Sequence, residues 1–314
     1  LGASVGISLF PADTRFASDL INWADMAMYK AKSNGGDQFQ FYSPSLTLNQ
    51  RQRLELESQL YRAVEQNQLC VHYQPIVNLQ TGELVSVEAL MRWRQPDGSL
   101  RTPDEFLQVL EETGLIARAG EGLLREACKT LKRCRQIHPK LRLSLNLSMN
   151  QLWQPSILEW VQKIVYSEGV PPNAITIEIT EDAMQRDSHR MESLLADLRI
   201  SGFEVAIDDF GTGYSSLSRL KDMPVAMLKL DKSFLAELDG GLVGSALVRS
   251  VRDMAGAMGL AVVAEGIETQ AQLNTVRQLN YDFGQGFLFA PPMAEEDLTQ
   301  LLQSQATGQR FAGM

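Results

Sequence analysis

The feature that most constrains the fold is a regular alternation of short strand-like segments with longer helical segments between Leu69 and Phe289. The expected strands span residues 69–77, 84–92, 141–147, 174–179, 203–209, 225–231, 260–265 and 282–289. The main helices are expected near residues 118–137, 150–167, 188–200, 243–257 and 269–279. Eight such units predict an α/β fold, a parallel (β/α)8 barrel of the TIM type.

Two expected strands indicate which face of the sheet is apolar. Leucines at 141, 143, 145 and 147 alternate with Arg142, Ser144, Asn146 and Ser148, and isoleucines at 175, 177 and 179 alternate with Thr176, Glu178 and Thr180. The apolar positions should face the helices and the polar positions the inside of the barrel. A doubly wound open sheet would normally have a glycine-rich loop after its first strand, and Pro75-Ile76-Val77-Asn78 is not one.

The chain divides into four expected segments. Residues 1–45 are a short N-terminal α/β fragment with the order strand, helix, strand, which is too small to fold well alone. Residues 46–56 are a linker helix within a polar, helix-favouring stretch, residues 57–304 are the barrel domain, and residues 305–314 are a tail.

Composition narrows the class of ligand. A formal charge of −9 and a pI near 5.0 argue against a surface that tracks polymeric nucleic acid, although a small anion can still bind through metal ions. Cys70, Cys128 and Cys134 have no C-x-x-C spacing, so neither a disulfide framework nor a thiolate zinc site is indicated. His72, His138 and His189 are scattered, which indicates surface or packing roles rather than a histidine metal site.

A cytoplasmic location is expected. The cysteine usage fits a reducing compartment, and the sequence has neither a long apolar run nor a signal-peptide pattern. Leu1 in place of Met suggests a piece of a longer protein. We therefore expect any sensor or membrane anchor to lie in a part that precedes this chain.

Polar side chains occur at or near the C-terminal ends of seven of the eight expected strands. They are Glu88, Asn146, Glu178, Asp208 with Asp209, Lys229, Glu265 and Gln285. In a barrel these ends meet at one mouth. Two carboxylates 4 Å apart repel by roughly 4 kcal/mol at an effective dielectric of about 20, so a cluster implies a bound cation, protonation or a different fold.

The oxygen donors point to a hard divalent metal. Glu88, Asn146, Glu178 and Asp208 supply carboxylate and amide oxygens suited to Mg²⁺ or Mn²⁺. The pair Asp208-Asp209 lets one acid bridge two cations while the other contacts the second. Two such ions about 4 Å apart polarise a phosphodiester and lower the pKa of a water, and Lys229 could orient that water or offset charge on phosphorus.

Each residue also has a structural interpretation. A single strand-end acid is more often a helix cap or turn residue, and Asp208-Asp209 ahead of Gly211 and Gly213 could form a turn with side-chain hydrogen bonds. Lys229 could simply pair with Glu178 or with Asp231. Coincidence at so many successive strand ends favours a site over these separate explanations.

Residues 210–217 form an expected loop at the barrel mouth, where barrel enzymes close over substrate. Glu268 could hold this loop by accepting hydrogen bonds, or could be an acid at a helix N-terminus. Arg92 could make a forked contact to a phosphate, or belong to a structural ion pair.

An ordered series of short motifs runs through the expected barrel domain. The motifs are Tyr73-Gln74-Pro75-Ile76, Glu88-Ala89-Leu90, Asn146-Leu147-Ser148, Glu178-Ile179-Thr180-Glu181, Asp208 to Leu217, Lys229-Leu230-Asp231, Ala264-Glu265-Gly266-Ile267-Glu268 and Gln285-Gly286-Phe287. The series spans almost all of residues 57–304 and is far more specific than any tripeptide within it. It resembles the EAL family of cyclic di-GMP phosphodiesterases.

This resemblance implies a two-metal enzyme that hydrolyses cyclic di-GMP to linear pGpG with Mg²⁺ or Mn²⁺. Glu88, Asn146, Glu178, Asp208 and Asp209 would hold metal. Lys229 and Glu265 would act on the attacking water, Glu268 would anchor the substrate loop, Gln285 would support the site, and Gln74 and Arg92 would touch substrate. The alternative is a receptor that binds cyclic di-GMP without hydrolysis, whose hallmark, missing metal ligands, is not found here.

The N-terminal fragment is similar to the end of a GGDEF diguanylate cyclase domain, through Ser4-Val5-Gly6-Ile7-Ser8 and residues 24–32. Gly35-Gly36-Asp37-Gln38-Phe39 looks like the cyclase signature but follows a helix, where that family has only a turn. The true signature and any sensory region would precede Leu1, so cyclase activity is not predicted. A homodimer through the barrel is left open.

Overall fold

The computed structural model describes residues 2–33, 35–185, 188–213, 220–236, 242–307 and 311. The chain forms two compact units. The first comprises Leu1–Gln66 with Phe106–Thr113, and the second comprises Asn67–Glu105 with Gly114–Met314. We describe each unit by itself.

The first unit has the strand–helix–strand order that the sequence predicts. Strands β1 (Val5–Ile7) and β2 (Phe39–Phe41) pair in parallel. Helix α1 (Ala17–Ser33) lies between them in the sequence. Helix α2 (Pro44–Glu65) contains the predicted linker and extends beyond it at both ends. Pro44 lies in the first turn, where the backbone N–H that proline lacks would have no partner within the helix. Arg53 of α2 pairs with Glu112 of α3 (Leu107–Glu112).

The second unit is a closed barrel, which confirms the predicted fold class. Its strands follow the order β3-β11-β10-β9-β8-β7-β6-β4, and β3 also pairs with β4 to close the ring. The strand bounds are β3 Leu69–Asn78, β4 Leu84–Arg94, β6 Arg142–Asn146, β7 Ile175–Thr180, β8 Glu204–Phe210, β9 Met227–Leu230, β10 Ala261–Ala264 and β11 Phe283–Gln285. A short strand, β5 (Leu100–Arg101), pairs with the end of β4 outside the ring.

The prediction of an all-parallel barrel is wrong for the first strand. Strand β3 is antiparallel to both of its neighbours, β4 and β11, whereas the other barrel pairs are parallel. Asn78 donates its amide to the carbonyl of Glu83 at 2.8 Å, so a tight turn joins β3 to β4. A connection this short allows only an antiparallel pair, because a parallel pair needs a crossover of a dozen or more residues.

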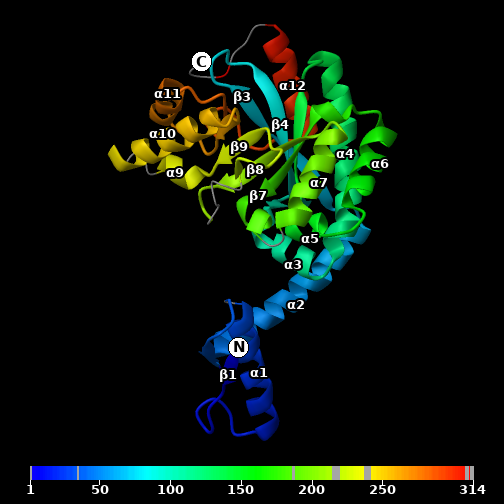
Figure 1. The fold of residues 1–314 in the computed structure, drawn as a ribbon. Coiled ribbons are helices and arrows are strands. Elements are labelled where there is room, and N and C mark those ends of the chain that lie inside the picture. The colour runs from blue at the N-terminus through cyan, green and yellow to red at the C-terminus, as the bar shows by residue number, and fades with distance from the viewer. Residues whose placement is uncertain are drawn as a thin grey trace. The chain divides into compact units, whose positions relative to one another are not determined.

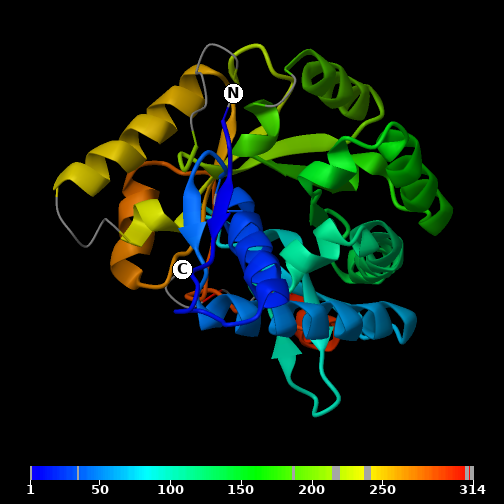
Figure 2. The same ribbon diagram turned by 90° about the horizontal axis from the view of Figure 1, so that it is seen from below.

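Helices surround the barrel strands (Figures 1 and 2). Their bounds are α4 Leu115–Ile137, α5 Met149–Leu152, α6 Ile157–Glu168, α7 Ser188–Ile200, α9 Lys232–Ala236, α10 Leu242–Ala257, α11 Gln270–Gln278 and α12 Glu295–Ala306. The single helix predicted near 150–167 is split into α5 and α6. Pro155 lies in the gap, and proline disfavours helical backbone at the residue before it.

The barrel core separates apolar and polar residues as the alternation predicts. Leu143, Ile175 and Ile177 are fully buried and pack in the core with Leu124, Cys128 and Leu131 of α4. The intervening polar positions lie on the inner side of the strands. Arg142 donates to the Thr176 hydroxyl and to Glu204, and these three residues lie at the N-terminal ends of their strands, opposite the strand C-termini.

None of the helices in the described part of the chain combines the length and apolar character needed to cross a membrane.

Candidate active site

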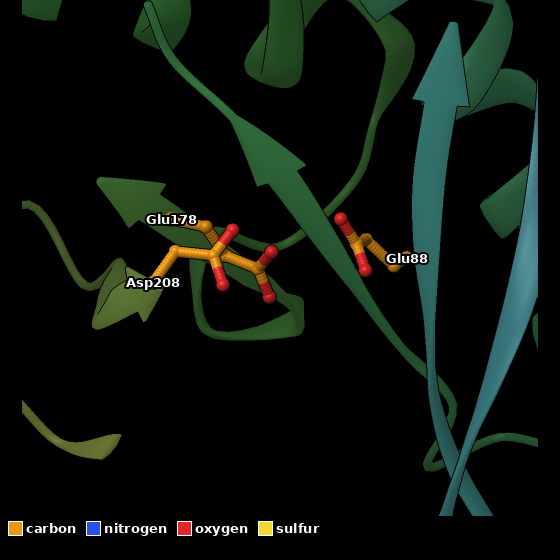
Figure 3. A group of neighbouring side chains, drawn as sticks. All are labelled: Glu88, Glu178 and Asp208. Carbon is orange, nitrogen blue, oxygen red and sulfur yellow. The ribbon is translucent and has the colours of Figure 1, made fainter. Parts of the chain in front are cut away.

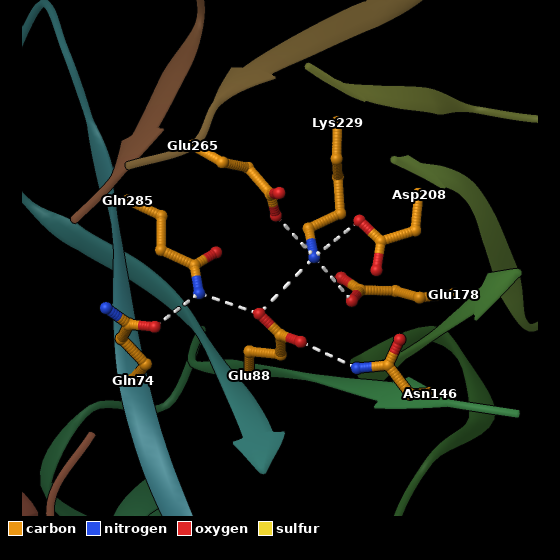
Figure 4. Close-up of polar contacts among 8 residues, drawn as sticks. All are labelled: Gln74, Glu88, Asn146, Glu178, Asp208, Lys229, Glu265 and Gln285. Atoms are coloured by element: carbon orange, nitrogen blue, oxygen red, sulfur yellow. Dashed lines mark hydrogen bonds and ion pairs between the residues drawn. The ribbon is translucent and has the colours of Figure 1, made fainter. Parts of the chain in front are cut away.

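The site is centred on the Lys229 ammonium, from β9. Its Nζ lies 2.7 Å from Glu178 Oε2, 2.7 Å from Glu265 Oε1, 3.1 Å from Asp208 Oδ1 and 3.3 Å from Glu88 Oε2 (Figure 4). The lysine side chain is 1 % exposed. Such a cation can remain buried only because acids from four different strands or strand ends surround it.

Amide side chains fix the Glu88 carboxylate. Gln285 Nε2 donates to Glu88 Oε2 at 2.6 Å, and Asn146 Nδ2 donates to Glu88 Oε1 at 2.6 Å (Figure 4). Gln285 Nε2 also donates to Gln74 Oε1 at 2.9 Å, and Gln74 donates to the carbonyl of Ala290. Because both oxygens of Glu88 accept a charge-assisted bond, its orientation is set before any ligand binds.

An irregular backbone brings two neighbouring acids to the mouth. Successive residues of a regular strand point to opposite faces, so Asp208 and Asp209 could not both line it. Asp209 has a φ of 53°, in the left-handed region, and the pairing of β8 with β9 shifts between Ile207 and Phe210. This local bulge breaks the alternation, a feature that is frequent next to active sites.

The loop after β8 is attached through Glu181, a residue to which the sequence analysis gave no role. Glu181 Oε2 accepts the amide of Gly211 at 2.7 Å and that of Gly213 at 3.4 Å. Glu181 is buried and lies three residues after Glu178. The two acids of Glu178-Ile179-Thr180-Glu181 therefore differ in role, one reaching the cluster and the other the loop. Residues 214–217 of the predicted loop lie outside the described residues.

The side chain of Glu268 makes no hydrogen bond to residues 210–213, the part of the loop that the structure describes. Its side chain is exposed, and its backbone amide donates to Gln272 Oε1 at 2.8 Å. Thr269 and Gln272 form a capping box at the start of α11, so Glu268 lies just before the helix N-cap, where the helix dipole favours an acid. The anchoring role of Glu268 stays a prediction, because residues 214–217 of the loop lie outside the described residues.

The charges of the cluster do not balance. Five carboxylates, Glu88, Glu178, Asp208, Asp209 and Glu265, face one ammonium, so full ionisation leaves a formal excess of four negative charges. Buried like charges either take up protons or bind cations.

The pKa values show the protonation response. Burial raises the pKa of Glu265 to about 8, with Lys229 opposing the shift. Burial also raises the pKa of Glu178 well above its usual range against the pull of Lys229, and Glu88 and Asp208 add to the increase. For Glu88, Lys229 and the amide donors outweigh burial and lower the pKa. Carboxylates surround Lys229 so closely that its pKa is raised well above normal despite burial.

The same residues also fit a pair of divalent cations. Glu88, Glu178 and Asp208 form one group whose oxygens lie within 4.8 Å of one another, and Asp208, Asp209 and Glu265 form a second (Figure 3 shows the first). Asp208 belongs to both groups. Glu178 Oε1 is buried without a hydrogen-bond partner among the described residues, so an acceptor faces the centre of the cluster unused. All donors are hard oxygens.

The structure thus brings together the predicted residues Glu88, Asn146, Glu178, Asp208, Asp209, Lys229, Glu265 and Gln285. Glu88 lies in the middle of β4 rather than at its end, because β4 continues beyond the barrel beside β3. Gln74, predicted to touch substrate, is 8 % exposed and is bonded to Gln285. Arg92 is half-buried further along β4, and its Nη1 donates to the Met91 carbonyl.

Gly286 supports a prediction about the backbone beside Gln285. A Cβ at this position would overlap backbone atoms of Ile267, which cannot move as a side-chain tip can. We expect Gly286→Ala to cost about 1–3 kcal/mol of unfolding free energy and to lower activity by displacing Gln285. Urea denaturation measures the stability. Gly122→Ala in α4 is the matched control, since nothing lies within 4 Å of its Cβ; equal stability losses would refute the argument.

Comparison with known proteins reveals clear relatives. A family model described as EAL domain matches residues 57–292. The chain is 37 % identical over 299 residues to the bifunctional diguanylate cyclase/cyclic di-GMP phosphodiesterase MucR of Pseudomonas aeruginosa, covering 95 % of this chain and 44 % of MucR. It is 35 % identical over 303 residues to the cyclic di-GMP phosphodiesterase NbdA of the same organism, covering 96 % of this chain and 39 % of NbdA. The chain therefore spans less than half the length of these relatives.

Solved structures of phosphodiesterase and EAL domains are also similar to this chain. A structure of the PaMucR phosphodiesterase in complex with c-di-GMP matches with a TM-score of 0.75 and 37 % identity, over 78 % of this chain and 99 % of that one. The EAL domain of DcpA from Mycobacterium smegmatis matches with a TM-score of 0.62 and 35 % identity, over 74 % of this chain and 95 % of that one.

Proposed function

Because this chain belongs to the EAL domain family, we propose that it is a metal-dependent phosphodiesterase that hydrolyses cyclic di-GMP to linear pGpG. The observation that carries the proposal is the cluster of five carboxylates around one ammonium; when all five are ionised, two divalent cations would neutralise the excess of four negative charges. The names of the relatives MucR and NbdA, and the c-di-GMP complex of PaMucR, support the choice of substrate.

We propose that Mg²⁺ or Mn²⁺ is the metal. Glu88, Asn146, Glu178 and Asp208 would hold one ion, and Asp208 with Asp209 would hold the second. Cations in such a site supply Lewis acidity that activates water and stabilises charge on a phosphodiester. A donor set of carboxylate and amide oxygens, with no sulfur or imidazole, is the set that these hard ions prefer.

The remaining residues would orient water and substrate. Lys229 places a permanent positive charge beside four carboxylates, where it can position the attacking water and offset charge on phosphorus. Glu265, next to Lys229, would accept the proton from that water. Gln285 and Gln74 keep Glu88 in place, and Arg92 would contact substrate from the outer part of β4.

A receptor that binds cyclic di-GMP without hydrolysis is the second candidate. Its expected mark is the loss of metal ligands, and none of the acids predicted to hold metal is absent here. The two candidates differ in one outcome, the fate of bound nucleotide when metal is supplied.

We expect purified protein to convert cyclic di-GMP to pGpG when Mg²⁺ or Mn²⁺ is present, and to stop when EDTA is in excess. Chromatographic separation of the two nucleotides measures the conversion. Cyclic di-GMP that stays bound and intact across both metals would instead identify the receptor. No binding and no product would reject both candidates.

Metal should also stabilise the fold, because cations bind the folded cluster and not the unfolded chain. At 100 times the dissociation constant a ligand contributes about 2.7 kcal/mol, which for a barrel of this size raises Tm by roughly 5–10 °C. Thermal unfolding with MgCl₂ or MnCl₂, compared with NaCl at equal ionic strength, measures the shift. An equal shift in NaCl would show that the cluster does not bind the divalent ion.

We propose that residues 1–45 are the C-terminal part of a GGDEF-like domain. Support comes from the motif similarity and from the exposed apolar side chains of Val5, Phe39 and Phe41 on the small β1–β2 sheet. The name of the relative MucR includes diguanylate cyclase activity, and this chain covers 44 % of MucR. We do not propose cyclase activity for this chain.

A further inference from the structure

The ribbon formed by β3 and β4 carries His72, which the sequence analysis assigns to a surface or packing role and to which the proposed mechanism gives no role. We propose that His72 determines base specificity, with its ring Nε2 accepting a hydrogen bond from a guanine of the bound cyclic dinucleotide. This inference rests on the proposed function and deepens it, because it names a residue that recognises the base rather than the phosphate.

The pairing register places His72 on the face of the ribbon that looks toward the cluster. Gln74 lies opposite Glu88, His72 opposite Leu90, and Cys70 opposite Arg92. Directly opposed residues of an antiparallel pair, and residues two apart on one strand, share a face. Gln74 and Glu88 both accept hydrogen bonds from Gln285, so their face is the one that contains the active site.

Exposure increases along this face from the cluster outward. Gln74 and Glu88 are buried, whereas His72, Leu90 and Arg92 are partly exposed. Tyr73, on the opposite face, is 1 % exposed and lies in the core. His72 is two residues further out than Gln74, about 7 Å along the strand, and a base joined to its phosphate through one ribose spans a comparable distance.

A carbonyl group orients the His72 ring. Tyr73 and Met293 exchange backbone hydrogen bonds of 2.7 and 3.0 Å, which keeps residues 290–293 beside β3. His72 Nδ1 lies 3.5 Å from the carbonyl oxygen of Pro292. A carbonyl only accepts, so this long contact favours the tautomer with the proton on Nδ1, in which Nε2 is an acceptor. Among the residues that the structure describes, none donates to Nε2.

The environment keeps the ring neutral. Burial lowers the pKa of His72, and the positive charges of Arg92 and Arg94 lower it further, against the opposing effect of the Pro292 carbonyl and of Asp297. A neutral ring retains the lone pair on Nε2 that a protonated ring would lack.

His72 and Arg92 together match the edges of guanine. They are diagonal neighbours across the ribbon, a spacing of about 7–8 Å. Arginine donates well to guanine O6 and N7. Arg92 Nη1 donates to the Met91 carbonyl, and none of the described residues accepts a hydrogen bond from its other N–H groups. Guanine then offers its N1–H and N2 amino donors to an acceptor such as His72 Nε2. Adenine has no amino group at C2, and at C6 it has an amino donor where guanine has a carbonyl acceptor. His72 and Arg92 together therefore favour guanine.

The experiment compares His72→Phe, which keeps a ring but loses the acceptor, with His72→Gln, whose side-chain oxygen can replace Nε2. For His72→Phe we expect KM and Kd for cyclic di-GMP to rise about tenfold, the effect of one lost hydrogen bond, with kcat within about twofold of wild type. His72→Gln should restore most of the affinity. Hydrolysis of bis(p-nitrophenyl) phosphate, which has no base, should change far less. His189→Phe, at an exposed histidine of α7, is the matched control.

The outcomes separate this inference from the proposed function. Unchanged affinity of His72→Phe for cyclic di-GMP, in a wild-type enzyme that makes pGpG, overturns the role of His72 alone. Equal losses on both substrates, shared by His72→Gln, show a structural role and also overturn it. Wild-type protein that binds but does not hydrolyse cyclic di-GMP rejects the proposed function, while the Kd comparison still decides the role of His72. Wild-type protein that does not bind cyclic di-GMP refutes both.

Discussion

Lys229→Met should destabilise the metal-free protein by about 3–5 kcal/mol, the usual cost of removing one partner of a buried ion pair. The ammonium is the counter-ion for four carboxylates within 3.3 Å, and methionine fills a similar volume without charge. Urea denaturation in EDTA measures the loss. Mg²⁺ or Mn²⁺ should restore much of the stability, since cations can replace the missing charge, but should not restore hydrolysis.

The same substitution at an exposed lysine serves as the control. Lys163→Met in α6 removes a charge from the surface and should change stability by less than about 0.5 kcal/mol. If Lys229→Met were as stable in EDTA as wild type, the carboxylates would already be protonated, and the account of Lys229 as their counter-ion would be wrong.

Glu178→Gln should lower kcat/KM for cyclic di-GMP by on the order of 1,000-fold, because several kcal/mol of transition-state stabilisation depend on the cations. Glu178 is fully buried, 2.7 Å from Lys229, and has one unpartnered oxygen. Glutamine has the same shape, so the change tests the charge rather than the volume. Steady-state kinetics of pGpG formation measure the loss, and calorimetry should show weaker Mn²⁺ binding.

Glu204→Gln is the matched control for this change. Glu204 is also a strand residue of the barrel, but it pairs with Arg142 at the end opposite the cluster. The kcat/KM of the Glu204→Gln enzyme should stay within a few-fold of the wild-type value. A Glu178→Gln enzyme with near-normal kcat/KM would show that Glu178 does not hold the catalytic metal.

The carboxylate cluster could be predicted from the sequence because the strand pattern gave each acid a position. Glu178, Lys229 and Glu265 follow or end apolar runs, and parallel strands of a barrel deliver such residues to one mouth. The direction of β3 could not be recognised in this way. Its apolar pattern is the same in either direction, and only the short turn at residues 79–83 determines that it is antiparallel.

Roles that depend on tertiary contacts were also missed. Glu181 and Glu268 are both acids three residues after a cluster acid, and the sequence offers no means of telling which one meets the loop. The structure shows Glu181 bonded to Gly211, because the turn after β7 directs it there, whereas Glu268 is exposed and lies just before Thr269, the N-cap of α11. The resemblance gave Gln74 a contact with substrate, and its bond to Gln285 could not be predicted because it joins residues far apart in the chain.

The most direct measurement is a crystal structure of the wild-type protein with Mn²⁺, using anomalous scattering to locate the metal. The account predicts two manganese peaks, both within coordination distance of Asp208, with Glu88 and Glu178 beside one and Asp209 beside the other. The account would be contradicted if no manganese bound to the cluster at an Mn²⁺ concentration that supports activity, so that Lys229 alone balanced the acids.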